Sequence, residues 1–98
     1  MSKLNTYYIY IMTNKPRGTL YTGFTNDLKT RVNQHKDGTG SYFAKKYNLT
    51  KLVYFEEIME ASTAIEREKQ LKAGSRQKKI ELIEKNNSDW KDLSDNLQ

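Results

Sequence analysis

Apolar and polar residues alternate along the first half of the chain in a way that predicts a small β-sheet. Residues 7–13, rich in tyrosine and isoleucine, indicate a strand, and residues 20–24 resume the same pattern. The intervening residues 14–18 include a proline and a glycine and indicate a turn, so the two strands form a hairpin. A short apolar run over residues 52–56 predicts a third strand.

Helical spacing of apolar residues predicts the remaining elements. Helices are expected over residues 27–36, 43–47 and 62–72, and from residue 76 to about residue 85. Thr25 or Asn26 is expected to cap the first of these helices and Ser75 the last, and Gly74 ends the one between. The order of elements predicts an α+β fold, a small three-stranded antiparallel sheet flanked by helices. The length fits one domain over residues 1–98, with a polar tail from about residue 87.

The register of the hairpin decides which tyrosines share a face of the sheet. If Asn14 and Thr19 close the loop, paired residues have numbers of opposite parity, so even positions on the first strand lie opposite odd positions on the second. Tyr10 and Tyr21 are then expected on the same face.

Polar side chains interrupt the apolar faces of two predicted helices. Each stripe has i, i+3, i+4 and i+7 spacing: Leu28, Arg31, Val32 and His35 in one helix, and Ala61, Ala64, Ile65 and Glu68 in the other. A half-buried charged or titratable side chain is costly unless it is paired or bound. These polar residues therefore need partners.

Two interpretations supply those partners. In the structural one, Arg31 and Glu68 form a salt bridge, with His35 at its rim. In the functional one, the three side chains line a polar pocket that faces the sheet, and Tyr10 and Tyr21 complete it. Helical spacing alone favours the structural interpretation, and each tyrosine taken singly does too, because tyrosine is an ordinary strand residue.

The composition limits the kinds of partner that the protein is expected to bind and the compartment in which it is expected to act. The net charge of +5 favours a polyanionic partner such as nucleic acid. The absence of cysteine excludes disulfides and cysteine metal sites and suits the cytoplasm, and no apolar run approaches the ~18 residues that a membrane span needs. Basic residues gather late in the chain, from Arg67 onward: Lys69, Lys72, Arg76, Lys78 and Lys79. Lys45 and Lys46, with Tyr47 available for stacking, form a second candidate arm for nucleic acid.

Several short motifs occur in an order that resembles a known family. Tyr8-Ile9-Tyr10 and Tyr21-Thr22-Gly23 stand where the GIY-YIG nucleases have their two signatures. Arg31 and His35 match that family's helix arginine and histidine, and residues 64–68 match the helix that carries its metal-binding glutamate, Glu68. Asn87 is a candidate for its late asparagine. The chain is most similar to the small stand-alone bacterial members, which are related to the N-terminal nuclease domain of a bacterial excinuclease.

The sequence departs from the family pattern at three places. Tyr8 replaces the glycine of the first signature, Thr22 replaces the isoleucine of the second, and Ser88 follows Asn87 where close relatives often have proline. Both signature tyrosines remain. Gly23 also remains, and a close approach of backbone or substrate explains that glycine better than a catalytic role does.

The resemblance implies a metal-dependent endonuclease that hydrolyses DNA phosphodiester bonds with low sequence specificity, in repair or recombination. Glu68 would hold one Mg²⁺ or Mn²⁺, and Arg31 would grip the phosphate. Tyr10 or Tyr21 would be the base, with His35 supporting or replacing it. We also expect this protein to bind nucleic acid weakly and in a salt-sensitive way.

Two other functions compete with this one. The first is a nucleic-acid-binding module that keeps the GIY-YIG fold without catalysis. The second is a protein-interaction adaptor that uses the tail around Trp90, although Trp90 and Leu93 can also dock back on the domain. The enzyme is favoured over both because four residues of the family pattern are intact: Tyr10, Tyr21, Arg31 and Glu68.

Overall fold

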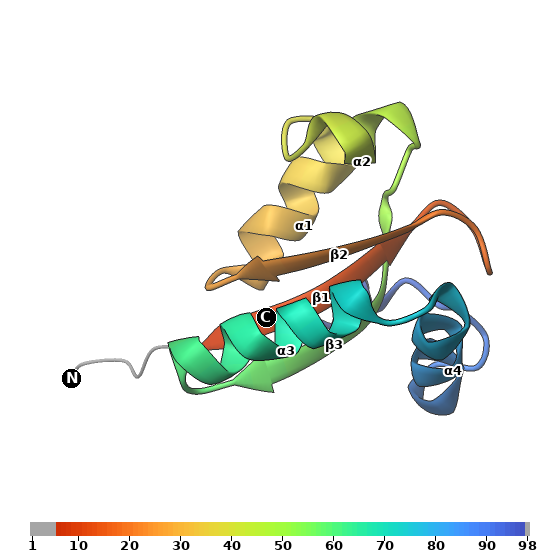
Figure 1. Ribbon diagram of the computed structural model, residues 1–98. Helices are drawn as coiled ribbons and strands as arrows, with labels where there is room; N and C mark the ends of the chain where they lie inside the picture. The colour runs from red at the N-terminus through yellow and green to blue at the C-terminus, as the bar shows by residue number, and fades with distance from the viewer. Residues whose placement is uncertain (1–5, 98) are drawn as a thin grey trace.

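Three antiparallel strands form the centre of the molecule (Figure 1). The structure is a computed structural model that describes residues 6–97; residues 1–5 and 98 of the expected domain lie outside it. β1 (Tyr7–Thr13) pairs with β2 (Leu20–Thr25) on one side and with β3 (Lys51–Ile58) on the other, which gives the order β2-β1-β3. The predicted α+β class and three-stranded antiparallel sheet are confirmed, although β3 is longer at both ends than the sequence indicated.

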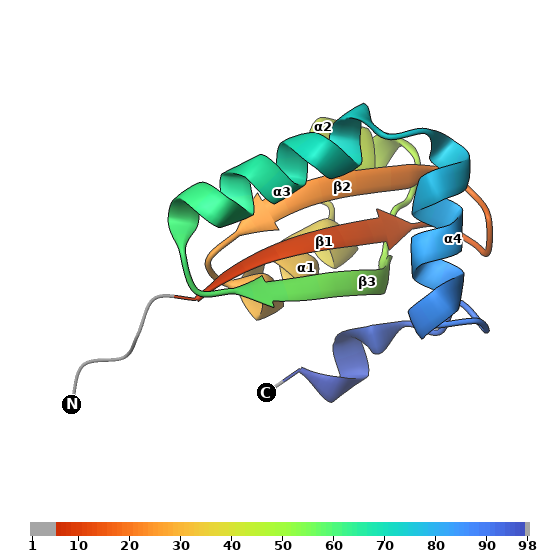
Figure 2. The same ribbon diagram turned by 60° about the horizontal axis from the view of Figure 1, so that its bottom comes forward.

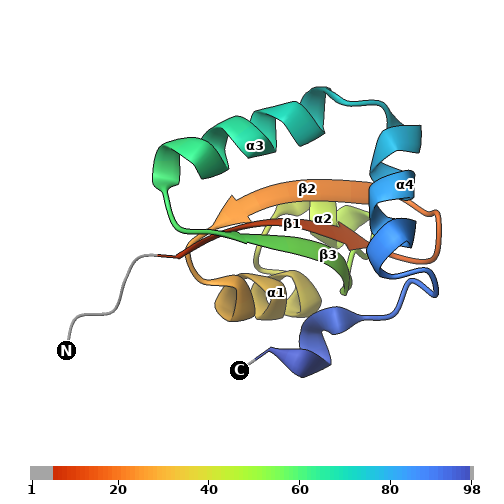
Figure 3. The ribbon, with the colours of Figure 1, turned by 90° about the horizontal axis from the view of Figure 1, so that it is seen from below.

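Helices cover both faces of this sheet (Figure 3). α1 (Leu28–Asp37) and α2 (Tyr42–Lys46) lie on one face, and α3 (Ala61–Ala73) and α4 (Arg76–Asn86) lie on the other. A short 3-10 helix, Leu93–Asn96, returns along β3 (Figure 2). The four predicted helices are present, each with ends within one residue of the expected ones.

The central strand β1 contributes side chains to the cores on both faces, because neighbouring residues of a strand point in opposite directions. The core beneath α1 and α2 consists of Tyr10, Met12, Leu28, Val32, Ala44, Leu49 and Leu52. The opposite face is filled by Ile9, Ile11, Ala64, Leu71, Ile80 and Ile83, with Val53, Tyr54 and Trp90 beside them. Burying each of the larger aliphatic side chains contributes about 1.5–3 kcal/mol.

The start of α1 differs from the sequence expectation. Asp27 is the N-cap, and its carboxylate accepts hydrogen bonds from Thr30 N at 3.2 Å and from Thr30 Oγ1 at 2.9 Å. The expectation of Thr25 or Asn26 is wrong because Thr25 still pairs with Tyr8 in the sheet. Its hydroxyl instead accepts from the Asp27 N–H at 3.0 Å and turns the chain into the helix. Ser75 caps α4, as predicted.

The tail after α4 docks back on the domain, as predicted. Trp90 is buried, and its indole N–H donates to Glu84 at 2.7 Å. Asp92 accepts from the Leu52 N–H at 3.3 Å and pairs with Lys36 at 2.6 Å, which ties the tail to β3 and to α1. Over residues 6–97, no helix combines the length and the apolar character that a membrane span needs.

Candidate active site

Tyr10 and Tyr21 lie on the α1 face of the sheet. The register pairs Tyr10 with Gly23 and Met12 with Tyr21, which is the parity that the loop length predicts. The two tyrosine rings lie 6.2 Å apart between centroids. Tyr10 is 1% exposed, whereas Tyr21 is half-buried at the free edge of β2.

Gly23 allows the Tyr10 ring to cross β2. A Cβ atom at this position would lie 2.4 Å from both Cζ and Oη of Tyr10, far inside van der Waals contact. The phenol therefore occupies the space that any other residue would fill. This is a close approach of a side chain to the backbone, and it fixes where the Tyr10 hydroxyl lies.

His35 contacts both tyrosines from α1. Its Nε2 lies 3.0 Å from Tyr10 Oη, and its ring packs edge-on against Tyr21 with centroids 5.2 Å apart. The side chain is 2% exposed, and Nδ1 has no hydrogen-bond partner within residues 6–97. Burial, and secondarily the charge of Arg31, lower the pKa of His35 below its ordinary 6.5. The imidazole is therefore neutral at pH 7 and able to accept a proton.

The pKa of Tyr10 depends on burial and on the charges of two other predicted site residues, Arg31 and Glu68. Burial is the main cause that raises the pKa of Tyr10 well above 10, and Tyr21 and Glu68 raise it further, while Arg31 lowers it. Tyr10 thus keeps its proton in the free protein. The charges of Arg31 and Glu68 thus affect the same hydroxyl with opposite sign, although α1 and α3 lie on opposite faces of the sheet (Figure 3).

Arg31 is half-buried and does not form the salt bridge with Glu68 that the structural interpretation required. No carboxylate within the described part of the chain lies within 4.0 Å of its guanidinium. Glu68 pairs instead with Lys72, one turn further along α3, at 2.9 Å. A half-buried guanidinium without a carboxylate is available for an anionic ligand.

Glu68 lies on the inner side of α3, but the stripe around it differs from the predicted one. Ile65 is 44% exposed, whereas Ala64 and Leu71 are buried. The inner face of α3 therefore runs from Ala64 past Glu68 to Leu71, and including Ile65 in it was wrong. The Glu68 side chain is 20% exposed. Residues 6–97 contain no cluster of three or more His, Cys, Asp or Glu side chains that could enclose a metal ion.

The predicted basic residues divide into two groups. Lys72 and Lys79 line a shallow groove of about 340 Å³ beside the free edge of β2, together with Leu20, Tyr21, Thr22 and Phe43. Lys45, Lys46, Lys69 and Lys78 are exposed on α2, α3 and α4. Arg76 is also exposed and donates to the backbone carbonyl of Arg17. Arg67 does not belong to either group, because Glu56 binds its guanidinium.

Sequence reasoning missed the aromatic residues at the start of α2. Phe43 is 42% exposed and lies between Tyr21 and Tyr47, with ring centroids 6.2 Å and 4.7 Å away. Tyr42 is 81% exposed, and Lys46 lies over the Tyr47 ring at 5.5 Å. Two adjacent aromatic residues at the start of a short helix that is otherwise polar were the available signal. They extend the tyrosine pair into an exposed aromatic and basic surface.

Asn87 is explained by the fold. It is 8% exposed, and its Nδ2 donates to the carbonyls of Val53 at 3.1 Å and Lys91 at 2.9 Å, while its Oδ1 accepts from the Lys91 N–H at 3.0 Å. These bonds join the end of α4 to β3 and to the tail. Asn87 makes none of its hydrogen bonds with Tyr10, Tyr21 or His35.

The site combines two tyrosines of the hairpin, a buried histidine, a carboxylate and an arginine that pairs with no carboxylate in residues 6–97. This set of residues defines a class of protein. The family model of the GIY-YIG catalytic domain matches residues 6–81. The chain belongs to the GIY-YIG family, which is a nuclease family, and the resemblance drawn from the two signatures is confirmed.

The relatives are small bacterial proteins. The chain is 40% identical over 80 residues to a UPF0213 protein of Staphylococcus saprophyticus, a match that covers 82% of this chain and 96% of that one. A UPF0213 protein of Staphylococcus aureus is 36% identical over the same shares of both chains. The solution NMR structure of a UPF0213 protein from Bacillus halodurans has a similar fold, with a TM-score of 0.56 and 26% sequence identity. That match covers 89% of this chain and 92% of the other.

Proposed function

We propose that this protein is a metal-dependent endonuclease that hydrolyses DNA phosphodiester bonds. The observation that carries the proposal is the buried hydrogen bond between Tyr10 and His35. On the same helix as His35, the half-buried Arg31 pairs with no carboxylate in residues 6–97. A proton-accepting pair next to an open cationic group fits attack of water on an anionic ester.

Tyr10 and His35 act together as the base. Because burial raises the pKa of Tyr10, its phenol does not ionise on its own. The neutral His35 can accept the phenolic proton at Nε2 while Tyr10 Oη takes a proton from the attacking water. The hydroxide that remains forms the new bond to phosphorus, and the bond to the leaving oxygen breaks. Tyr10 ends with one proton, as it began, and His35 carries the extra one.

Arg31 and Tyr21 orient the phosphate. The guanidinium has forked donors that match two phosphate oxygens, and the charge that develops during attack strengthens these bonds. Tyr21 is half-buried at the sheet edge and borders the groove that Lys72 and Lys79 also line. Its side chain can therefore contact a substrate that lies in this groove.

The carboxylate of Glu68 fits the single divalent ion that the family implies. A hard ion such as Mg²⁺ or Mn²⁺ accepts one carboxylate and completes its shell with water and phosphate oxygens. No second acidic or histidine ligand is gathered around Glu68 in residues 6–97, so binding should be weak until substrate adds its oxygens. When bound, the metal would polarise the phosphate and stabilise the leaving oxygen.

The surroundings of the groove fit DNA as the substrate. Lys72 and Lys79 border the groove itself, and Phe43 connects it to the exposed rings and lysines of α2. Lysines neutralise phosphates without reading bases, which supports low sequence specificity. A role in DNA repair or recombination, in the cytoplasm, is the part of the proposal that rests on the family resemblance alone.

A cutting assay tests the function. The protein is incubated with single-stranded, duplex, flapped and branched DNA, with Mg²⁺, with Mn²⁺ and with chelator. We expect metal-dependent cutting of at least one of these substrates. Binding to DNA without cutting any of them in either metal would overturn the proposal and favour a non-catalytic binding module.

A further inference from the structure

The rotation of α3 about its own axis decides where Glu68 points, and apolar packing specifies that rotation weakly. Within the described chain, Ala64 and Leu71 are the only residues that α3 buries. These two residues lie in one line along the helix. Packing along a single line does not prevent the helix from rotating about its own axis, which we call its roll. Another contact must fix the roll.

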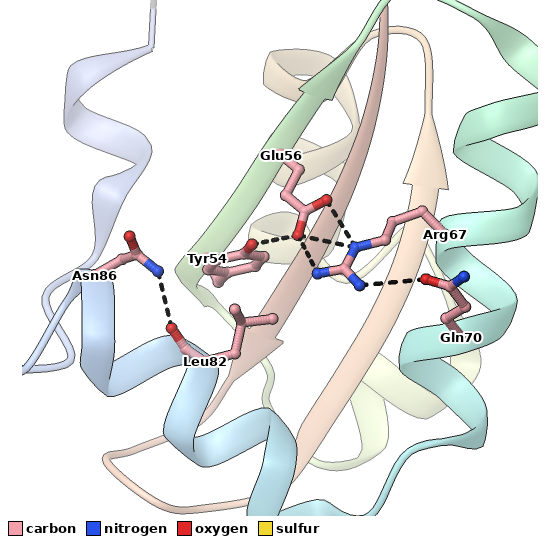
Figure 4. Close-up of polar contacts among 6 residues, drawn as sticks. All are labelled: Tyr54, Glu56, Arg67, Gln70, Leu82 and Asn86. Atoms are coloured by element: carbon pink, nitrogen blue, oxygen red, sulfur yellow. Dashed lines mark hydrogen bonds and ion pairs between the residues drawn. The ribbon is translucent and has the colours of Figure 1, made fainter.

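A cluster of polar side chains beside this line provides that contact (Figure 4). Arg67 Nε lies 2.9 Å from Glu56 Oε1, and Arg67 Nη2 lies 2.8 Å from Glu56 Oε2, which makes the pair bidentate. The Tyr54 hydroxyl donates to the same carboxylate, and Arg67 Nη1 donates to Gln70 at 3.4 Å. The fork geometry of a bidentate pair restricts the orientation of both side chains.

The two ends of this contact lie on a strand and on a helix. Tyr54 and Glu56 are on β3, where they pair with Ile11 and Ile9 on the face that α3 covers. Burial alone would raise the pKa of Glu56, but the bonds from Arg67 and Tyr54 lower it. The Glu56 carboxylate is therefore ionised at neutral pH, where it forms an ion pair with Arg67.

Arg67 and Glu68 are neighbours in the sequence and lie on opposite sides of the buried line. Successive helical residues are about 100° apart, so Arg67 lies to one side of the line through Ala64 and Leu71, and Glu68 lies to the other. Arg67 binds Glu56 on β3, whereas Glu68 pairs with Lys72, which lines the groove beside Tyr21. Any roll that frees Arg67 from Glu56 therefore changes where the Glu68 carboxylate points.

We propose that Arg67 is a positioning residue, which sets the roll of α3 through its bidentate bond to Glu56 and so aims the Glu68 carboxylate at the active site. This inference rests on the proposed nuclease function. Groups that orient a metal ligand typically change metal affinity or activity by about 10–100-fold when they are removed. Loss of Arg67 should therefore raise the metal concentration needed for half-maximal cutting, because the metal ligand is displaced while the other catalytic side chains stay in place.

A matched control exists in the same chain. Arg17 forms a second bidentate pair, with Glu84 on α4, at 2.9 Å and 2.8 Å. That pair joins the β1–β2 loop to α4 and does not involve α3. Replacing either arginine by glutamine breaks one bidentate pair, but Arg67→Gln alone releases the roll of α3.

The experiment measures the DNA cutting rate and the rise in melting temperature that metal binding causes, each as a function of Mg²⁺ and of Mn²⁺ concentration, for the wild type, Arg67→Gln, Arg67→Lys and Arg17→Gln. Melting curves first fix a temperature at which all four are folded. We expect Arg67→Gln to need about 10–100-fold more metal for half-maximal cutting. Arg67→Lys should recover part of this loss, because it keeps the charge but not the fork. Arg17→Gln should match the wild type.

The outcomes distinguish a failure of this inference from a failure of the proposed nuclease function. If the wild type cuts no substrate, the proposed function fails and the inference fails with it. If the wild type cuts and Arg67→Gln keeps the metal requirement of Arg17→Gln, only the inference is overturned. A lower rate at an unchanged metal requirement overturns it too, since that result indicates a general loss of structure. If Arg67→Gln does not fold, the same comparison is made with Arg67→Lys.

Discussion

At the scale of single residues, the site depends on how close Tyr10 comes to Gly23. The phenol crosses the neighbouring strand through the space of a missing side chain, and His35 then meets its hydroxyl at 3.0 Å. The Tyr10–His35 hydrogen bond therefore depends directly on the absence of a side chain at Gly23. A sequence motif that keeps a tyrosine on one strand and a glycine on the next has a steric reason.

Gly23→Ala should damage both stability and cutting. The added methyl group would lie 2.4 Å from Tyr10 Oη, so the ring must move. Overpacking of this kind costs about 1–3 kcal/mol of unfolding free energy. Moving the hydroxyl away from His35 should slow cutting by about 100-fold, the effect of a misplacement of about 1 Å. Denaturant unfolding and the cutting rate measure the two effects.

Gly74→Ala is the control for that variant. A Cβ there would lie no closer than 3.4 Å to its nearest neighbour, the Gln70 carbonyl oxygen, which is ordinary contact. Gly74 has a φ of −72°, which alanine adopts freely. We expect wild-type stability and cutting. Equal losses in Gly23→Ala and Gly74→Ala would contradict the steric account.

The pH dependence of stability should report on His35. Burial and Arg31 lower its pKa in the folded protein, so below pH 6.5 the unfolded chain binds a proton that the folded one does not. Stability is therefore complete above pH 6.5 and declines as the pH falls from there toward the folded pKa. The chain has one histidine, so a decline between about pH 7 and 5.5 is assigned to it.

Melting temperatures across this range, for the wild type and for His35→Gln, check the assignment. The carboxylates with lowered pKa, such as Glu84 and Asp92 at about 2, lose their contribution only at lower pH, below the pKa of about 4 that such groups have in the unfolded chain. The wild type should lose stability on acidification, and His35→Gln should not. A wild type that melts at the same temperature at both ends of this pH range would show that His35 is not held neutral.

At the scale of elements, the sequence predicted the hairpin better than the helix orientation. Strand parity has a period of two, so a loop length was sufficient to place Tyr10 and Tyr21 on one face. Helix faces are broader, and the spacing that put Ile65 in the buried stripe with Glu68 does not show how α3 lies on the sheet. Ile65 is the exposed one.

The sequence did not predict which charged side chains pair with each other in the fold. Arg67 was grouped with the DNA-binding lysines because it stands among them, yet its partner Glu56 lies on a strand eleven residues earlier. Lys72, not Arg31, pairs with Glu68. A residue type and its spacing predict that a charge needs a partner, but the three-dimensional packing selects which one.

Asn87 gives a prediction at this scale, because it joins three segments. Asn87→Ala removes its hydrogen bonds to Val53 and Lys91 and leaves buried backbone groups unsatisfied, which should cost about 1–3 kcal/mol of unfolding free energy. Cutting should be unchanged at a temperature where the variant is folded. Denaturant unfolding and the cutting rate test this.

Asn86→Ala is its neighbouring control. Asn86 is exposed, and its Nδ2 donates to the Leu82 carbonyl within α4 (Figure 4). We expect a change within about 0.5 kcal/mol, as for other surface substitutions. A large loss of cutting in folded Asn87→Ala would instead give this asparagine a part in catalysis.

At the scale of the whole molecule, excess positive charge is expected to govern encounter with DNA. Binding should weaken steeply with salt, with a log–log slope of about −0.9 for each phosphate contacted. Replacing Lys45 and Lys46 together by alanine should reduce the size of that slope by about 2. Lys85→Ala, in the last turn of α4, should leave it unchanged. Affinities measured from low to physiological salt test this, and binding that ignores salt would contradict it.

The central claim is that Glu68 holds the metal for DNA cutting, and one comparison tests it most directly. Glu68→Gln and Glu66→Gln change neighbouring carboxylates on α3, the first half-buried beside the site and the second exposed. Glu68→Gln breaks only an i,i+4 pair with Lys72, worth about 0.3–0.5 kcal/mol, so its melting temperature should stay near that of the wild type.

The decisive measurement is the DNA cutting rate of these two variants and the wild type in saturating Mg²⁺ or Mn²⁺, with each protein shown to be folded. We predict that the wild type and Glu66→Gln cut at similar rates, that chelator stops both, and that folded Glu68→Gln does not cut. A Glu68→Gln protein that cuts at the wild-type rate would contradict the assignment of Glu68 as the metal ligand.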